Sequence, residues 1–301
     1  MRSKIMGILS VSMVLLLSMV LNSSTVNAQK YSWAKRAGLW AMDLGYGICA
    51  DNEGNVFVSG KYEMEAEFDS ITLKIEGNHD IFTAKYNSEG EIQWVRTGGG
   101  LWGDYAHSIA CDQAGNVYVT GEFEMVSYFH NGDSISAWGG NDLFLVKYDT
   151  HGNLIWLERA GALHSDKGFD IAVSGSSIYI VGKFKETCII GNTSLISAGN
   201  DDILLAKYDT VGNFHWGLRA GGKGEDEGFG VAVGPSGNVY FAGYFEKEAA
   251  FNEFSLKSKG MRDAFLAKYS PEGELIWVKN AGSTLNDYGW DVAVNDQEQI
   301  F

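Results

Sequence analysis

The chain has 301 residues, of which 45% are hydrophobic and 20% charged, and this ordinary globular composition excludes disordered and collagen-like classes. Its 38 glycines against 2 prolines indicate many tight turns rather than a proline-rich linker. The net charge of −15 repels phosphate backbones and anionic lipid, so we expect neither nucleic acid nor a membrane surface as a partner.

The first 28 residues have the pattern of an export signal. Arg2 and Lys4 precede an apolar run over residues 5–21, and Val26-Asn27-Ala28 ends in a small-x-small cleavage pattern. An uncleaved membrane anchor is the alternative, although the run is short for a span of about 20 residues. Cleavage leaves residues 29–301 with no membrane span, and loss of the two basic residues changes the net charge from −15 to −17. We therefore expect a secreted or cell-surface protein.

A repeat of about 61 residues dominates the rest of the chain. Successive marker tryptophans are 61, 62, 60 and 61 residues apart, at Trp33, Trp94, Trp156, Trp216 and Trp277. An aspartate recurs with the same spacings, at Asp43, Asp104, Asp166, Asp226 and Asp287. A second aspartate recurs at Asp80, Asp142, Asp202 and Asp263, and a Lys-Tyr pair follows each of these.

Each repeat contains signals for four antiparallel strands. In the second repeat we expect strands over residues 107–111, 117–123, 143–148 and 154–158, with Asp/Asn-Gly turns after the first and third. About twenty residues of loop, with room for a minor hairpin, join the second and third strands. The third strand is apolar on both faces, so both faces must be covered. Repeated sheets that cover one another predict an all-β protein, a β-propeller of four-stranded blades.

The segments Gly-Asn-Val-Tyr-Val-Thr-Gly (115–121), Asp-Leu-Phe-Leu-Val-Lys-Tyr-Asp (142–149) and Gly-Asn-Leu-Ile-Trp (152–156) resemble the bacterial β-propeller repeat called SBBP, for seven-bladed β-propeller. The resemblance covers residues 33–301. It implies an exported or cell-surface protein of a family without an assigned role, and it is specific for the fold rather than for a function.

The register of the repeats predicts an incomplete ring. Trp33 marks a fourth strand without the preceding three, and Phe301 falls inside the second strand of a fifth repeat. We expect about four and a half blades, a fragment of a larger ring. A closed five-bladed ring is the alternative.

Three cysteines follow the repeat as small buried residues. Cys49 and Cys111 stand at positions that other repeats fill with alanine or valine. They are one step out of register and are expected to face opposite ways, so a disulfide between them is not predicted.

The expected interaction face is the end of the molecule that carries the long loops and the links between blades. Trp40, Trp102 and Trp138 fall there, away from the marker position, and are the candidate interaction residues. Capping of the blade packing is their alternative role. The repeated aspartates are expected to hold loops through backbone N–H groups, with metal or ligand binding as the alternative. His107 replaces an aromatic residue on the innermost strand and is expected to line the channel.

These features favour a binding or scaffold module for a protein or glycan partner. No catalytic, metal or cofactor motif is recognised, so an enzyme is not expected and no cofactor is assigned. Two alternatives stay open, namely a propeller-based hydrolase or lyase and a passive structural repeat of a large surface protein.

Overall fold

The computed structural model describes residues 32–301, so the expected leader, 1–28, lies outside the described residues. Within 32–301 the regular structure consists of eighteen β-strands and one short 3₁₀ turn, η1 (His130–Gly132). The described part of the chain has no helix long and apolar enough to cross a bilayer. The prediction of an all-β, antiparallel fold is confirmed.

The strands form four consecutive four-stranded antiparallel units, and sixteen strands join into one hydrogen-bonded sheet. Unit 1 contains β1 (Leu44–Ala50), β2 (Val56–Tyr62), β5 (Asp80–Tyr86) and β6 (Ile92–Gly99), with a separate hairpin of β3 (Ala66–Phe68) and β4 (Ile71–Leu73). Unit 2 contains β7 (Tyr105–Cys111), β8 (Val117–Phe129), β9 (Ser134–Tyr148) and β10 (Leu154–Gly161). Unit 3 contains β11 (Lys167–Ser174), β12 (Ser177–Ile190), β13 (Thr193–Asp209) and β14 (Phe214–Gly222). Unit 4 contains β15 (Glu227–Val233), β16 (Val239–Phe251), β17 (Phe254–Tyr269) and β18 (Leu275–Ala281).

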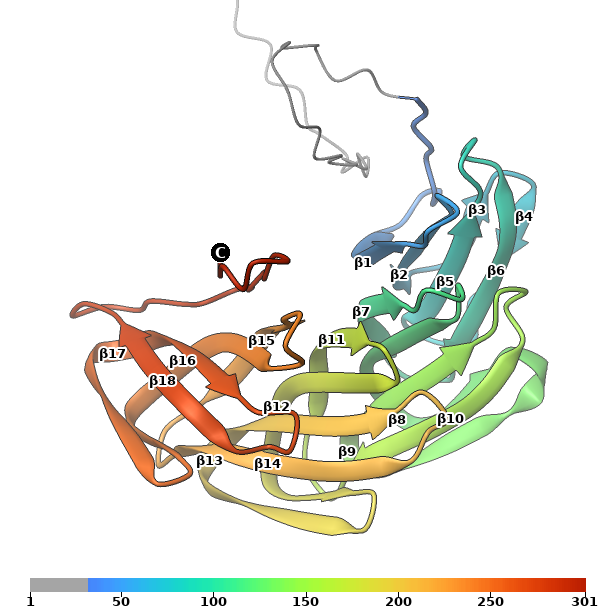
Figure 1. Cartoon of the computed structure of the whole chain (residues 1–301). Coiled ribbons are helices and arrows are strands. Elements are labelled where there is room, and N and C mark those ends of the chain that lie inside the picture. Colours follow the sequence, from blue (N-terminus) through green and yellow to red (C-terminus); the bar gives the residue numbers. More distant parts are fainter. Residues whose placement is uncertain (1–31) are drawn as a thin grey trace, which may run out of the picture.

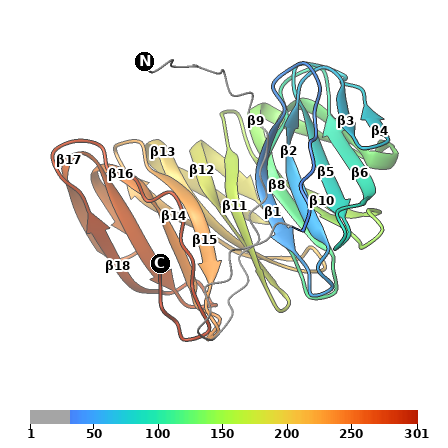
Figure 2. The same ribbon diagram turned by 90° about the horizontal axis from the view of Figure 1, so that it is seen from above.

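The four units follow an arc, with the first strand of each unit on its concave side (Figures 1 and 2). Neighbouring inner strands contact one another from β1 through β7 and β11 to β15. The arc is open between β1 and the last residues of the chain (Figure 1), so the closure of the alternative five-bladed ring is not seen within 32–301.

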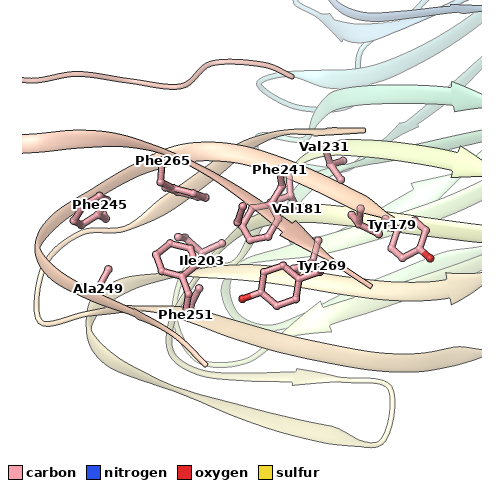
Figure 3. Close-up of a cluster of buried hydrophobic side chains, with 14 residues drawn as sticks. Tyr179, Val181, Ile203, Val231, Phe241, Phe245, Ala249, Phe251, Phe265 and Tyr269 are labelled. Atoms are coloured by element: carbon pink, nitrogen blue, oxygen red, sulfur yellow. The ribbon is translucent and has the colours of Figure 1, made fainter. Parts of the chain in front are cut away.

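Each pair of units encloses its own hydrophobic core. Between units 3 and 4, Tyr179, Val181 and Ile203 of one sheet pack against Phe241 and Phe265 of the next (Figure 3). All five side chains are buried. Full burial of one such side chain stabilises the fold by about 1.5–3 kcal/mol, so stacking of the sheets is the main source of stability.

The long connections between the second and third strands are mostly regular hairpins. In units 2 to 4 both strands continue past a bulge, which leaves a residue with φ near +60° at the same place in each repeat. These residues, with their unit 1 equivalent, are Met64 (φ 59°), Met125 (60°), Glu186 (57°) and Lys247 (59°). The expected twenty-residue loops are therefore ordered extensions of the sheet.

A shared hydrogen-bond acceptor joins consecutive units. The main-chain carbonyl of Thr150, in the turn after β9, accepts from Lys85 Nζ at 3.2 Å and from Trp94 Nε1 at 3.1 Å, both of unit 1. The carbonyls of Thr210 and Pro271 receive the equivalent lysine and tryptophan at the next two junctions. We call this arrangement the turn-carbonyl latch, and it explains why Lys and Trp recur in every repeat.

Two details differ from the expectations. The segment around Trp33 is not a strand, since Ala37 forms only an isolated bridge with Phe68. Trp33 nevertheless donates its indole N–H to Ser88 O at 3.0 Å, as a fourth-strand tryptophan does elsewhere. Cys49 and Cys111 do not face opposite ways. Both are free, and burial together with a hydrogen bond to Cys111 raises the pKa of the Cys49 thiol.

Replacing Trp216 by phenylalanine should remove one latch bond while keeping the ring in the core. We expect the Trp216→Phe variant to lose about 1 kcal/mol of unfolding free energy, measured by urea denaturation. Trp277→Phe is the control, because the Trp277 indole N–H has no acceptor within residues 32–301. Equal losses in the two variants would show that the latch bond contributes nothing.

Candidate functional site

The links between units lie at the same end of the arc as the long hairpins. Each link runs beside the residues that precede the third strand of the preceding unit. The N–H of Asp104 donates to His79 O at 2.9 Å, and that of Asp166 to Asn141 O at 2.7 Å. Because these bonds join main-chain atoms, they place the links accurately and leave the link side chains free.

The first repeated aspartate fixes each link. One carboxylate oxygen accepts the N–H of the residue four positions earlier. These donors are Leu39 for Asp43 (3.0 Å), Gly100 for Asp104 (3.0 Å), Ala162 for Asp166 (3.0 Å), Gly222 for Asp226 (2.7 Å) and Ser283 for Asp287 (2.8 Å). The other oxygen of Asp43, Asp166 and Asp226 accepts an N–H just before the hairpin bulge. The aspartates therefore tie each link to the hairpin of its own unit.

The two aspartate series meet in buried pairs, one carboxylate from each of two consecutive units. A Cβ added at Gly161 would lie 2.6 Å from Asp142 Oδ1 and 3.0 Å from Asp166 Oδ2, so only glycine fits between them. Burial raises the pKa of Asp166 to about 7 and of Asp104 to about 8, and the negative charge of the paired aspartate adds to both shifts. The pairs therefore favour a bound proton near neutral pH.

The three candidate tryptophans all lie at this end of the arc. Trp40 and Trp102 are on links and are 93% and 47% exposed, whereas Trp138 is on β9 and 49% exposed. The Arg159 guanidinium covers one face of Trp138, with its carbon 3.3 Å from the ring centroid. The backbone of Gly139, next to Trp138, lies close against Leu163 of the following link.

Sequence reasoning missed the apolar residues that accompany these tryptophans. Trp40 stands three positions before Asp43, and the same position in the next two links holds Leu101 and Leu163, which are 78% and 71% exposed. The bulge residues Met64 and Met125 are also exposed. We call these exposed residues the apolar rim: Trp40, Met64, Leu101, Trp102, Met125, Trp138 and Leu163. The position three residues before the repeated aspartate is the sequence signal that identifies the two leucines.

The apolar rim follows the first half of the arc, and the second half also has exposed apolar side chains at this end, including Met261 (62%) and Leu285 (68%). In the later links Lys223 and Thr284 replace the exposed apolar residue, and in the later hairpins Glu186 and Lys247 replace the bulge methionines. The scaffold is the same in both halves, so the difference lies in the side chains alone.

A row of rings lines the concave side of the arc, one from each repeat. Tyr46, His107, Phe169, Phe229 and Trp290 follow one another with centroids 4.8–5.9 Å apart. His107 lies in this row, and its ring Nε2 is 3.2 Å from Glu122 Oε1.

Three titratable groups converge beside the ring row. Glu122 Oε1 also accepts from Lys167 Nζ at 2.9 Å. Burial works to raise the pKa of Glu122, but the hydrogen bond with His107 and the charge of Lys167 hold it below its usual value. Within residues 32–301 no group of three or more His, Cys, Asp or Glu side chains is arranged to hold a metal.

Comparisons with known proteins agree with the repeat. Residues 93–122 match the family model of the SBBP beta-propeller repeat. An uncharacterized WD repeat-containing protein of Acanthamoeba polyphaga mimivirus is 23% identical over 246 residues, covering 68% of this chain and 18% of the relative. The regulatory protein FlaEY of Caulobacter vibrioides is 28% identical over 179 residues, covering 56% of this chain and 18% of the relative. The chain thus matches less than a fifth of the length of either curated relative.

A crystal structure of a protein of unknown function from Bacteroides caccae covers 85% of this chain and 89% of its own length. It has 10% sequence identity and a TM-score of 0.33, a likeness too weak to carry an argument.

The buried aspartate pairs predict that stability falls as the pH rises. The folded-state pKa of Asp104, about 8, is well above the usual value for an aspartate, so its stabilising contribution is full in acid and is lost as the pH rises through about 8. We expect a lower free energy of unfolding at about pH 9 than at about pH 6, with each pKa unit worth about 1.4 kcal/mol.

The Asp104→Asn variant keeps an acceptor for the Gly100 N–H and has no charge to gain, so it should lose a large part of this pH dependence. Glu89→Gln, in an exposed turn, is the matched control and should keep it. A wild-type stability that rises between these two pH values would contradict the prediction.

Proposed function

For this β-propeller repeat protein, which carries an SBBP repeat, we propose a role as an exported binding module whose apolar rim docks a partner. The observation that carries the proposal is the concentration of exposed Trp, Leu and Met side chains on the first three links and the first two hairpins of an otherwise regular arc. The positions of Trp40, Leu101 and Leu163 hold Lys223 and Thr284 in the later links, and Glu186 and Lys247 replace the bulge methionines. The fold itself therefore does not require apolar residues there.

Exposed apolar side chains on a rigid support are suited to binding. Soluble monomers rarely expose large contiguous apolar patches, and tryptophan is enriched at the energetic centres of interfaces. The link aspartates and main-chain bonds hold the rim residues in place, which reduces the entropy lost when a partner binds.

A protein partner suits this rim better than a glycan. Glycans stack on the faces of aromatic rings, whereas Leu101, Leu163 and the two methionines offer aliphatic surface that complements apolar side chains. One face of Trp138 is already covered by Arg159. A glycan that stacks on Trp40 and Trp102 is the alternative that the cross-linking experiment below distinguishes.

Export and a larger ring complete the proposal. The leader pattern of residues 1–28 supports secretion or surface display. The same latch at three successive junctions, together with the curvature in Figure 1, supports an arc that further units continue into a ring.

Catalysis, as a hydrolase or lyase, is the second candidate. The cluster of His107, Glu122 and Lys167 favours it, because three titratable groups meet beside the concave surface. The three groups already satisfy one another, however, and Asn141 Nδ2 donates to the remaining Glu122 oxygen at 2.8 Å. The lowered pKa keeps the Glu122 carboxylate ionised, and an ionised carboxylate is a poor proton donor. Binding is therefore the better supported function.

Photo-cross-linking in the producing cells tests the rim. A photoreactive residue at Trp40, Trp102 or Leu163 should give a discrete adduct, because these side chains would be buried against the partner. Digestion of the adduct with a protease or with glycosidases identifies a protein or a glycan.

The control position is Val211, which is 72% exposed in a short turn at the other end of the arc and should give no adduct. Equal labelling at Val211 and at the rim would refute a specific face. No adduct at any position would instead support the passive structural repeat.

Export predicts a processed amino terminus. The protein isolated from the producing cell should begin at Gln29, because the cleavage pattern ends at Ala28. Mass spectrometry of the intact protein reads this directly. A chain that keeps residues 1–28 would contradict cleavage and favour the membrane anchor.

A further inference from the structure

The four units can be compared at the second repeated aspartate, which begins β5 in unit 1 and lies inside the third strand of the other units. In unit 3, Asp202 Oδ2 accepts the N–H of Ala198 at 2.8 Å and a guanidinium N–H of Arg219 at 3.2 Å. In unit 4, Asp263 Oδ2 has the same kind of side-chain donor, Asn280 Nδ2, at 3.1 Å. In units 3 and 4 a side chain of the fourth strand therefore donates a hydrogen bond to this buried carboxylate, and in unit 3 the donor also carries the opposite charge.

Unit 1 lacks that donor. Thr97 pairs with Phe82 in the register in which Arg219 pairs with Leu204 and Arg159 with Phe144, so Thr97 stands where units 2 and 3 have arginine and unit 4 has asparagine. Asp80 Oδ2 accepts the N–H of Glu76 at 2.9 Å.

The rest of the Asp80 carboxylate is poorly satisfied. The Tyr62 hydroxyl is 3.5 Å from Asp80 Oδ2 and donates to Lys74 O at 3.1 Å. Asp80 Oδ1 is buried and has no hydrogen-bond partner within residues 32–301, as is also true of Asp142 Oδ1 and Asp202 Oδ1, so the difference in unit 1 lies in the missing fourth-strand donor.

A cavity of about 420 Å³ occupies the place of the missing side chain. Its walls come from unit 1 and from the tip of the unit 2 hairpin, and include Tyr62, Asp80, Thr97, Gly99, Tyr128 and Phe129. A cavity of this size is within the usual range for small-molecule sites, roughly 300–1,000 Å³. Aromatic walls around a buried carboxylate suit an organic cation.

The charged groups around the cavity favour a cation. Lys74, Glu76, Asp80 and His130 line it. Asp104, the buried neighbour of Asp80, has a pKa of about 8 and adds little negative charge at pH 7.5. Burial, with the charge of Arg96, lowers the pKa of His130, so this ring is neutral near pH 7.5. Lys74 is the one like charge, and its side chain is exposed.

We propose that this cavity binds a guanidinium cation, which occupies beside Asp80 the position that the Arg219 guanidinium holds beside Asp202 in unit 3. Bonding to the buried carboxylate gives the cation a charge-assisted hydrogen bond, and the tyrosine and phenylalanine rings contact its apolar stem. The inference stands apart from the apolar rim, since it uses none of the rim residues.

Isothermal titration calorimetry of the purified protein with ethylguanidinium at about pH 7.5 tests the site, with ethylurea as the neutral isostere. We expect one site for ethylguanidinium and none for ethylurea. A peptide with a single arginine and its citrulline twin form the second arm. Tighter binding of the arginine peptide assigns the site to a protein side chain, and tighter binding of ethylguanidinium assigns it to a free small molecule.

Two variants should weaken binding about tenfold or more, the equivalent of one charge-assisted bond. Thr97→Arg supplies the arginine that units 2 and 3 have at this position, and should also raise the melting temperature. Asp80→Asn removes the charge but keeps an acceptor for the Glu76 N–H. Gln93→Arg is the matched control, because it adds the same charge on β6 outside the cavity and should leave the affinity unchanged.

The pH profile gives a further readout. Burial, with the charge of Glu76, raises the pKa of Asp80 to about 6, so the affinity should fall below this pH as the carboxyl is protonated. Binding that Thr97→Arg leaves intact, or equal binding of ethylurea, would overturn the proposal.

Discussion

The stacking of units depends on one main-chain carbonyl at each junction that receives two donors from the preceding unit. Lys85 and Trp94 share Thr150 O, and the same pair of residues recurs at the next two junctions. The lysine ammonium also lies over an aromatic ring, 5.3 Å from the centroid of Phe57 in unit 1. The tryptophan indole and the lysine ammonium must both reach the same turn carbonyl of the next unit, and this requirement fixes the rotation between neighbouring sheets. The same rotation repeated along the chain gives the arc in Figure 1.

The end of the arc with the short turns and the end with the links and hairpins have different roles. The short turns at one end supply the carbonyls of the latch, so their backbone is committed to stacking. At the other end the aspartates hold the links and hairpins through N–H groups, and the side chains of the links remain exposed. Function can therefore vary at this end without disturbing the packing, and the apolar rim of the first three links is such a variation.

The repeat made much of this fold predictable. Equal spacing of Trp and Asp places the strands, and a third strand apolar on both faces requires neighbouring sheets. The ordered hairpins were not predictable, because the left-handed bulge residues Met64, Met125, Glu186 and Lys247 share no side-chain chemistry. Leu101 and Leu163 were overlooked because leucine alone does not indicate exposure. The contact of Cys49 with Cys111 and the cavity beside Asp80 depend on register between strands, which a single sequence does not specify.

The latch accepts its donors through backbone oxygen, and the residue that carries this oxygen is Thr150 or Thr210 at two junctions and Pro271 at a third. The carbonyl that receives Trp33 belongs to Ser88. The contact between blades therefore does not depend on the side chain of the accepting residue, and proline can occupy the position. A blade gained by tandem duplication would fit its neighbours from the start, without compensating substitutions. Such a gene can lengthen or shorten by whole repeats while each new copy remains free to acquire its own surface.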